Sequence, residues 1–201
     1  MTLYEFVKVV LRPTTRLLLN AHVSGEEHVP AHGPLVVAAN HVSYLDPPIL
    51  GTWFPRTISF MAKRELFDIP VLGFLITKTH AFPVNREAGD VGAIRRALHI
   101  LKAGGVIGVF PEGRRNPEGE AQARSGAVLL AATARCPLVP VALIGTNVAA
   151  TRLRASNVEV RIGEPLVFQG RERKPTKTEL ATWTEQVSKQ ITSLKERPRR
   201  A

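Results

Sequence analysis

Short apolar runs recur along this chain and are separated by longer stretches with helical or turn-rich character. Runs of this length, rich in β-branched residues, are typical of buried strands. We expect strands at residues 35–39, 57–62, 79–84, 106–110, 138–144 and 158–163. Because tight hairpins cannot join parallel strands, the helices between the runs predict crossover connections. The predicted fold class is α/β: a single domain with a largely parallel mixed sheet flanked by helices.

The N-terminal stretch has helical rather than strand spacing. Leucine, phenylalanine and valine recur at helical intervals over residues 2–12, with charged residues around them, before Pro13 interrupts the pattern. We assign residues 1–20 to an amphipathic helix that lies on a membrane surface. Its charges argue against a secretory signal, and no apolar run in the chain is long enough to cross a bilayer. Any membrane contact is therefore expected to be peripheral.

Two further helices have recognisable ends. One is predicted to begin at Asp90 as its N-cap and to stop at Gly104 and Gly105. Its predicted apolar face consists of Val91, Ile94, Leu98 and Leu101. The last helix, over residues 176–195, begins where Thr176 and Glu179 predict a capping box. Together with a core over residues 35–168, these helices predict one domain that spans residues 1–201.

The charge of the chain indicates an anionic partner. The 201 residues include 27 Lys and Arg against 17 Asp and Glu, which gives a formal net charge of +10. Such an excess suits nucleic acid, an acidic membrane surface or a phosphorylated substrate. The single cysteine, Cys136, rules out an intramolecular disulfide and fits a reducing compartment.

One segment, NHVSYLDPP at residues 40–48, places a histidine and a carboxylate directly after a strand. Open α/β sheets usually bind ligands at this end of their strands. Residues five apart on a helix point about 140° apart, so His41 and Asp46 can meet only across a turn. Asp46 suits a helix N-cap and Pro47 the first helical position, an arrangement that directs the carboxylate towards the imidazole. The segment alone leaves two interpretations open, a general base or a capped turn beside a packed histidine.

A protein nucleophile is not evident in the sequence. No G-x-S-x-G motif occurs, Ser43 lies in the same turn as His41, and Cys136 has no identifiable partner. In the simpler scheme, His41 deprotonates a hydroxyl group of a second substrate, and the transfer is direct.

Two other strand ends deliver basic residues. In VIGVFPEGRRNPEG, at residues 106–119, Gly113, Arg114 and Arg115 can bring main-chain N–H groups and guanidinium groups onto a phosphate. A solvated charged turn explains this stretch equally well. The segment AFPVNRE adds Arg86 at a third strand end. Neither segment is a P-loop, because G-x-x-x-x-G-K-[ST] is missing.

Taken in order, four blocks of the chain resemble a known family. They are N-H-x4-D at residues 40–46, FPVNR at 82–86, FPEGRRN at 110–116 and LVPVALIGT at 138–146. This combination is similar to the motif blocks of the glycerolipid acyltransferases typified by 1-acylglycerol-3-phosphate acyltransferase. The resemblance implies acyl transfer from a thioester to the free hydroxyl of 1-acylglycerol-3-phosphate, giving phosphatidic acid, with residues 35–168 as the catalytic core.

The resemblance also implies roles for individual residues. His41 would be the general base and Asp46 its orienting partner, while Pro140 would lie in the block that shapes the acyl-donor site. The predicted substrate-binding residues are Asn40, Arg86, Glu112, Gly113, Arg114 and Arg115. The chain departs from the family pattern at Arg114 and Asn116, where Thr or Ser is common. The additional guanidinium still suits a phosphate but leaves the acceptor head group open.

The predicted partners are a lysophospholipid acceptor, an acyl thioester donor and an anionic membrane surface. The donor is either acyl-CoA or acyl-carrier protein, and neither a metal nor another cofactor is expected. The predicted location is cytoplasmic, peripheral on the inner face of a membrane. Three segments are candidates for shallow insertion: the N-terminal helix, residues 51–56 with Trp53 and Phe54, and residues 66–76. Taken alone, residues 66–76 are more typical of ordinary core.

Two alternatives to this function remain. The first keeps the chemistry and changes the acceptor to another lysophospholipid or to a lipid alcohol. The second is a non-catalytic basic module that binds lipid or nucleic acid, and it is motivated by the net charge of +10. It explains neither the spacing of His41 and Asp46 nor the order of the blocks, and no nucleic-acid-binding motif is present.

Overall fold

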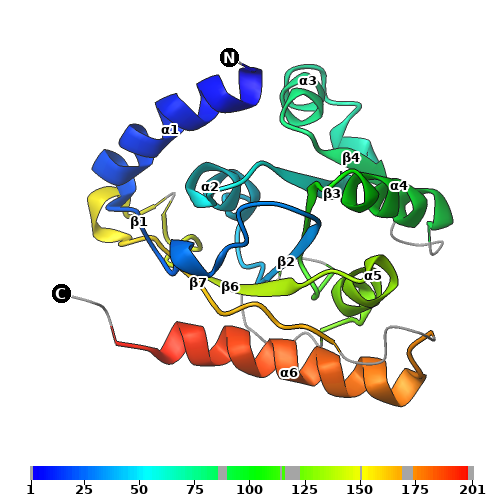
Figure 1. The fold of residues 1–201 in the computed structure, drawn as a ribbon. Helices are drawn as coiled ribbons and strands as arrows, with labels where there is room; N and C mark the ends of the chain where they lie inside the picture. Colours follow the sequence, from blue (N-terminus) through cyan, green and yellow to red (C-terminus); the bar gives the residue numbers. More distant parts are fainter. Residues whose placement is uncertain are drawn as a thin grey trace.

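In a computed structural model of the chain, a mixed sheet carries helices on both faces (Figure 1). The structure describes residues 2–85, 90–113, 115, 123–149, 151–168 and 174–198. Its strands are β1 (His22–Ser24), β2 (Leu35–Ala39), β3 (Ile58–Lys63), β4 (Phe82–Val84), β5 (Val106–Val109), β6 (Leu138–Ile144) and β7 (Glu159–Ile162). Its α-helices are α1 (Leu3–Leu19), α2 (Asp46–Trp53), α3 (Pro70–Lys78), α4 (Val91–Lys102), α5 (Gly126–Ala134) and α6 (Lys177–Glu196). Short 3-10 helices cover Glu26–His28, Arg64–Leu66 and Leu153–Ala155.

The strand order is β1-β7-β6-β2-β5-β3-β4. Every neighbouring pair is parallel except β6 and β7, which run antiparallel. The predicted α/β fold with a largely parallel mixed sheet is therefore confirmed. Strand β2 lies between β5 and β6, with Ala38 opposite both Val109 and Pro140. The carboxyl ends of these three strands meet at one edge of the sheet.

The core consists of two layers, one on each face of the sheet. On β2, Leu35 and Val37 pack in the layer that contains residues of α1 and α2, whereas Val36 and Ala38 pack in the layer of α4, α5 and α6. All five residues of β2 are buried. A strand covered on both faces needs apolar side chains at every position, which is why this segment is continuously apolar in sequence.

Helix α1 continues through Pro13, so the predicted interruption at this residue is wrong. Proline removes only one N–H donor from the helix, and its fixed φ is compatible with helical geometry. Two hydroxyl groups reinforce the preceding turn, since Thr14 donates to the carbonyl of Val10 and Thr15 to that of Leu11. The start of α1 carries a capping box between Thr2 and Glu5.

One side of α1 packs against the end of α2. The Tyr4 hydroxyl donates to the carbonyl of Gly51 over 3.0 Å and accepts from the N–H of Ile58 over 3.3 Å. The Lys8 ammonium donates to the carbonyl of Phe54. Burial raises the pKa of Tyr4 and lowers that of Lys8. Helix α1 thus satisfies two carbonyl groups that the carboxyl end of α2 leaves free.

Helix α4 begins as predicted, with the Asp90 carboxylate accepting from the N–H of Ala93 over 2.9 Å. Its predicted apolar face is partly wrong, because Val91 and Ile94 are 59% and 39% exposed. The face that meets the core consists of Ala93, Ala97 and Leu101. Small alanine side chains recur at i and i+4 here, and they allow the helix to lie close to the sheet.

The C-terminal helix agrees with its prediction, whereas the strands at the two edges of the sheet do not. The capping box between Thr176 and Glu179 is confirmed, and α6 ends at Glu196. The strand predicted over residues 79–84 is shorter, because the C-terminal turn of α3 occupies residues 79–81 and β4 starts at Phe82. Strand β1 was not predicted. It has three residues, and its pairing with β7 defines it rather than an apolar pattern.

The apolar surface differs from the sequence-based expectation. Trp53 and Phe54 are 3% and 0% exposed, so residues 51–56 contribute to the core and not to a membrane contact. Residues 66–76, which are typical of core, instead contain the exposed helix α3, where Val71 is 73% and Phe74 59% exposed. Helix α1 also leaves a row of apolar side chains exposed, which comprises Phe6, Val9, Val10, Leu17 and Leu18. Within the described residues, no helix has the length and apolar character that a membrane crossing requires.

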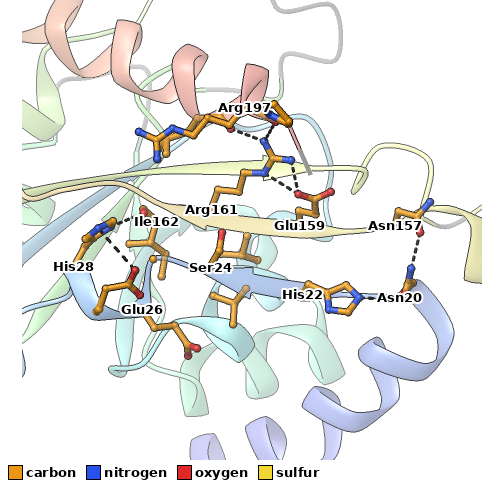
Figure 2. A pocket seen from close by; sticks show the side chains of 16 residues that line it. Asn20, His22, Ser24, Glu26, His28, Asn157, Glu159, Arg161, Ile162 and Arg197 are labelled. Carbon is orange, nitrogen blue, oxygen red and sulfur yellow. Dashed lines mark hydrogen bonds and ion pairs between the residues drawn. The ribbon is translucent and has the colours of Figure 1, made fainter. Parts of the chain in front are cut away.

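A hollow of about 690 Å³ lies at the β1 edge of the sheet (Figure 2). Arg161 projects there from β7 and donates to the carboxylate of Glu159 and to the carbonyl groups of Leu194 and Arg197. The guanidinium group therefore caps the carboxyl end of α6. The hollow is a structural junction between β1, β7 and α6. In the sheet order, β6 and β2 separate it from β5.

Candidate active site

The site begins where β2 ends. His41 follows Asn40, which is the first residue after the strand, and Phe110 follows β5. Because β2 and β5 are parallel neighbours, the two loops leave the sheet at the same edge. Ligand sites of open α/β sheets usually lie at this edge. The fold thus brings together the first and third motif blocks, which are about seventy positions apart in the sequence.

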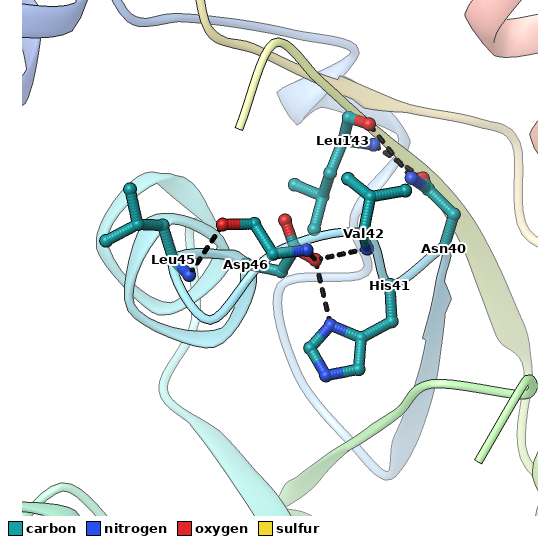
Figure 3. A network of polar contacts seen from close by, with 7 residues as sticks. Asn40, His41, Val42, Leu45, Asp46 and Leu143 are labelled. Atoms are coloured by element: carbon teal, nitrogen blue, oxygen red, sulfur yellow. Dashed lines mark hydrogen bonds and ion pairs between the residues drawn. The ribbon is translucent and has the colours of Figure 1, made fainter. Parts of the chain in front are cut away.

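His41 and Asp46 form a hydrogen bond. The imidazole Nδ1 lies 2.8 Å from Oδ2 of Asp46, and the two residues are 9% and 0% exposed. The same oxygen accepts the N–H groups of Val42 and Ser43, each over 2.7 Å. An oxygen that accepts these bonds requires Nδ1 to carry a proton, so in the neutral imidazole the lone pair is on Nε2. Figure 3 shows the second ring nitrogen pointing away from Asp46.

Asp46 does not cap α2 in the way the sequence predicts. It is the first residue of the helix, Leu45 is the N-cap, and no side chain caps the helix. If Asp46 were the N-cap, Pro48 would be the second helical residue and has no N–H to donate, so only the N–H of Ile49 could reach the carboxylate. The N–H of Ile49 donates instead to the carbonyl of Leu45. The carboxylate is therefore free to turn back to the loop, where it holds both the turn and the imidazole.

Asn40 ties the end of β2 to β6. Its carboxamide donates to the carbonyl of Leu143 over 2.9 Å and accepts the N–H of the same residue over 2.8 Å. Asn40 is 3% exposed. This pairing fixes the point from which the His41 loop departs (Figure 3). A direct contact between Asn40 and a substrate stays a prediction.

An aromatic stack supports the imidazole. The ring of Phe110 lies 4.2 Å from that of His41, with 24° between their planes, and Phe60 lies 5.9 Å beyond Phe110. Phe60 in turn packs over Gly108, where a Cβ atom would come within 2.5 Å of the phenyl ring. Sequence analysis missed Phe110, although it opens the FPEGRRN block directly after a strand.

An arginine that sequence analysis also missed, Arg124, packs against the turn after Phe110. Gly113 adopts a φ of 69°, and its N–H donates to the carbonyl of Phe110. The N–H of Arg124 donates to the carbonyl of Pro111 over 2.8 Å. A Cβ atom at position 113 would lie 3.5 Å from Nε of Arg124, so the Arg124 side chain lies directly against the glycine.

Arg115 contacts the loop of His41. Its Nη2 donates to the hydroxyl of Tyr44 over 2.8 Å, and its Cζ lies 3.6 Å from the centre of the tyrosine ring. Both side chains are exposed. A cationic group of the FPEGRRN block therefore borders the His41 loop, and a second one, Arg124, lies against the Gly113 turn.

Other predicted residues are placed differently. Arg86 and Arg114 lie outside the described residues, as does Asn116. Glu112 is half-buried in the turn that precedes Gly113. Pro140 is buried within β6, where its carbonyl accepts the N–H of Gly163 over 2.8 Å and its ring lies 2.9 Å from the position of a Cβ at that glycine. In the described part of the chain, no three His, Cys, Asp or Glu residues gather as metal ligands would.

Comparison with known proteins gives consistent results. The family model described as Acyltransferase matches residues 20–144. The 1-acyl-sn-glycerol-3-phosphate acyltransferase of Bacillus subtilis (strain 168) is 33% identical over 193 residues, which cover 96% of each chain. A protein of the same name from Borreliella burgdorferi is 29% identical over 62% of this chain and 51% of its own.

A solved structure agrees with these sequence matches. The crystal structure of the 1-acyl-sn-glycerophosphate (LPA) acyltransferase PlsC from Thermotoga maritima superposes with a TM-score of 0.75 at 26% identity. The similarity covers 98% of this chain and 81% of that one. The match of the family model over residues 20–144 and the identity over nearly the whole chain place the protein in a family. The chain belongs to the acyltransferase family.

Proposed function

We propose that this enzyme transfers an acyl group from a thioester to the free hydroxyl of 1-acylglycerol-3-phosphate, giving phosphatidic acid. The observation that carries the proposal is the contact between His41 and Asp46 beside the Gly113 turn. The choice of acceptor rests on the relatives, which are named as 1-acyl-sn-glycerol-3-phosphate acyltransferases. The arginine residues around the site supply the charge that such an acceptor needs.

In the proposed reaction, Nε2 of His41 takes the proton of the acceptor hydroxyl. The hydroxyl oxygen then attacks the thioester carbonyl, the new C–O bond forms, and the C–S bond breaks. The imidazolium returns the proton to the departing thiolate, so the enzyme is regenerated without a covalent intermediate. Asp46 stabilises the imidazolium and keeps Nδ1 protonated between cycles. General base catalysis of this kind contributes a factor of about 10² to 10⁴ in rate.

The phosphate of the acceptor would lie against the arginine groups. Arg115 and Arg124 are the described candidates, and guanidinium groups bind phosphate oxygens through paired N–H donors. Gly113, with its positive φ, and Glu112 form the turn that presents them. Arg86 and Arg114 lie outside the described residues and are included in the proposed phosphate site on the motif resemblance alone.

The acyl donor is the remaining substrate. Either acyl-CoA or acyl-carrier protein supplies the thioester in this proposal, and the chemistry requires no other cofactor. The strand that contains Pro140 ends beside Asn40, because Leu143 pairs with that side chain. We assign the donor to this side of His41, where Pro140 pairs with Gly163 just beyond the end of β7.

The protein would act as a peripheral enzyme on an anionic membrane surface at the cytoplasmic face. The exposed apolar side chains of α1 and α3 support this, because Val9, Leu17, Val71 and Phe74 are each more than half exposed. Lys78 ends α3, and Arg16 lies in the last turn of α1. Shallow insertion of apolar side chains together with attraction of basic residues to anionic lipid is typical of such enzymes.

A panel of acceptors and donors tests the proposal. The purified enzyme is incubated with lysophosphatidate, lysophosphatidylcholine or monoacylglycerol, each with acyl-CoA or acyl-carrier protein, and products are identified by mass spectrometry. Phosphatidic acid is the expected main product. Arg124→Ala should raise the KM for lysophosphatidate about tenfold or more, whereas Arg95→Ala on exposed α4 should not. Equal use of monoacylglycerol would contradict the proposed acceptor.

A further inference from the structure

Tyr44 lies in the loop between the two residues of the proposed dyad, yet it takes no part in holding that dyad. Its ring is 70% exposed, whereas Asp46 nearby is fully buried. The side chain reaches across to Arg115, which is 71 positions away in the sequence. Single exposed aromatic residues are ordinary on protein surfaces, so it is the contact with Arg115 that distinguishes Tyr44.

The geometry of the contact leaves part of the guanidinium free. Tyr44 uses the face of the Arg115 group through its ring, with Cζ 3.6 Å from the ring centre. It also accepts one N–H of Nη2 through its hydroxyl. A guanidinium has five N–H donors in its plane, so its remaining edge can still bind two phosphate oxygens. Stacking and phosphate binding are therefore compatible.

We propose that Tyr44 is a positioning residue that holds Arg115 ready for the phosphate of the acceptor. The inference rests on the proposed function. An exposed arginine samples many rotamers, and ordering it on binding costs conformational entropy. Contact with both the ring and the hydroxyl of Tyr44 restricts that freedom before the substrate arrives. Because Tyr44 belongs to the loop of His41, the same contact fixes the distance between the phosphate site and the base.

The test compares steady-state kinetics of Tyr44→Phe and Tyr44→Ala with wild type. Tyr44→Phe keeps the stack and loses the hydrogen bond, while Tyr44→Ala loses both. The KM for lysophosphatidate should rise about two- to fivefold in Tyr44→Ala and less in Tyr44→Phe, with the donor KM unchanged. The exposed Val91→Ala variant is the control and should match wild type. A rise in donor KM of equal size would contradict a role specific to the phosphate.

A double-mutant cycle separates positioning from a structural effect. In an Arg115→Ala background, the additional change Tyr44→Ala should cause no further rise in the KM for lysophosphatidate. Any turnover of the phosphate-free acceptor monoacylglycerol should be unaffected by Tyr44→Ala. An equal penalty in both backgrounds would overturn the proposal.

The failure of this inference can be told from the failure of the proposed function. If wild type converts lysophosphatidate and Arg115→Ala leaves its KM unchanged, the role of Tyr44 is refuted and acyl transfer stands. If wild type does not acylate lysophosphatidate, the proposed function itself fails.

Discussion

One oxygen of Asp46 accepts three hydrogen bonds, from the imidazole of His41 and from the N–H groups of Val42 and Ser43. The other oxygen is buried and has no hydrogen-bond partner among the described residues. A single carboxylate thus closes the turn and orients the imidazole. Of the two interpretations of the NHVSYLDPP segment, the capped turn is wrong in that Asp46 does not cap α2, whereas the general base stays a prediction that this geometry allows.

Asp46→Asn separates the charge of this residue from its shape. An asparagine oxygen can still accept the loop N–H groups, so the turn should persist, but an amide does not stabilise an imidazolium as a carboxylate does. We expect kcat to fall by about 10² to 10⁴ with little change in the KM for the acceptor. Steady-state kinetics measure this, and thermal unfolding verifies that the fold remains. A kcat equal to wild type would show that Asp46 has no part in catalysis.

At the scale of residues, the sequence identified those whose chemistry is explicit in a motif. His41, Asp46 and Arg115 could be named because their spacing or charge is readable along one segment. Phe110 and Arg124 could not, since their positions against His41 and Gly113 depend on how two loops fold. The misassigned N-cap was only partly visible in the sequence, because Pro48 lacks an N–H but Ile49 has one, and in the fold that N–H bonds the carbonyl of Leu45.

At the scale of elements, β5 links the hydrophobic core to the imidazole of His41. Gly108 lies in this strand, Phe60 of β3 packs over it, and Phe110 transmits the arrangement to His41. A side chain at position 108 has no room, because its Cβ would meet both Phe60 and Ile58 at 2.7 Å or less. The position of the imidazole therefore depends on a glycine in a neighbouring strand.

Gly108→Ala should overpack this stack. We expect the free energy of unfolding to fall by about 1 to 3 kcal/mol, as in other overpacked cores, and kcat to fall as Phe110 shifts. Chemical denaturation and kinetics measure the two effects. Gly126→Ala is the matched control, because no atom lies within 4 Å of a Cβ there. If Gly108→Ala were as stable and active as this control, the stack would not position His41.

The hydroxyl of Tyr4 holds helix α1 against α2, and its ionisation should change the free energy of unfolding. Pro55 cannot donate to the carbonyl of Gly51, and Tyr4 does so instead. Tyr4→Phe should reduce the free energy of unfolding by about 1 to 3 kcal/mol, because the N–H of Ile58 also loses its partner. Denaturant titration at pH 7 measures the loss.

The pH dependence follows from the direction of the pKa shift. Burial raises the pKa of Tyr4 above 10.0, so its contribution to stability is fully present below pH 10 and is lost as the pH rises through the raised value. The difference in stability between wild type and Tyr4→Phe should therefore shrink above pH 10. A difference that stays constant through this range would mean that Tyr4 ionises as it does in the unfolded chain.

Elements with local signals were predictable, and those defined by pairing were not. The caps of α4 and α6 follow from Asp90 and Thr176, whose side chains act on neighbours in sequence. Strand β1 exists because it pairs with β7, a contact between distant segments. The exposed face of α3 was taken as core because apolar composition alone does not tell what covers a helix.

At the scale of the whole molecule, basic charge and exposed apolar helices occur together. Helices α1 and α3 approach each other, since the ring of Tyr4 lies 5.6 Å from that of His80, just after α3 (Figure 1). Both helices expose apolar side chains, and the proposed membrane contact places them in the lipid headgroup region. The net charge of +10 favours anionic lipid.

Removing apolar contact from α3 should weaken membrane binding without loss of the fold. Val71 and Phe74 are exposed, so the double variant Val71→Ser, Phe74→Ser should remain folded. Co-sedimentation with phosphatidylglycerol vesicles should drop at least about tenfold, from the lost apolar transfer. Val167→Ser, at an exposed position outside α1 and α3, is the control. Wild-type sedimentation of the double variant would contradict an insertion surface on α3.

The fold class and sheet type were predictable from the whole chain because apolar runs alternate with helical stretches. The antiparallel pairing of β6 and β7 was not, since the described residues of the connection between them contain only a short 3-10 helix and carry no helical crossover pattern. The order of the four motif blocks shaped the functional prediction more than any single block. The convergence of three of them, the first, third and fourth, on one edge of the sheet follows from the parallel arrangement of β2, β5 and β6.

The most direct test of the account is acyl transfer from a thioester to lysophosphatidate by His41→Ala. We expect kcat to fall by about 10² to 10⁴, with the thermal unfolding midpoint near that of wild type. His99→Ala, at an exposed position of α4, should retain wild-type activity. Undiminished transfer by folded His41→Ala would contradict the claim that His41 is the general base.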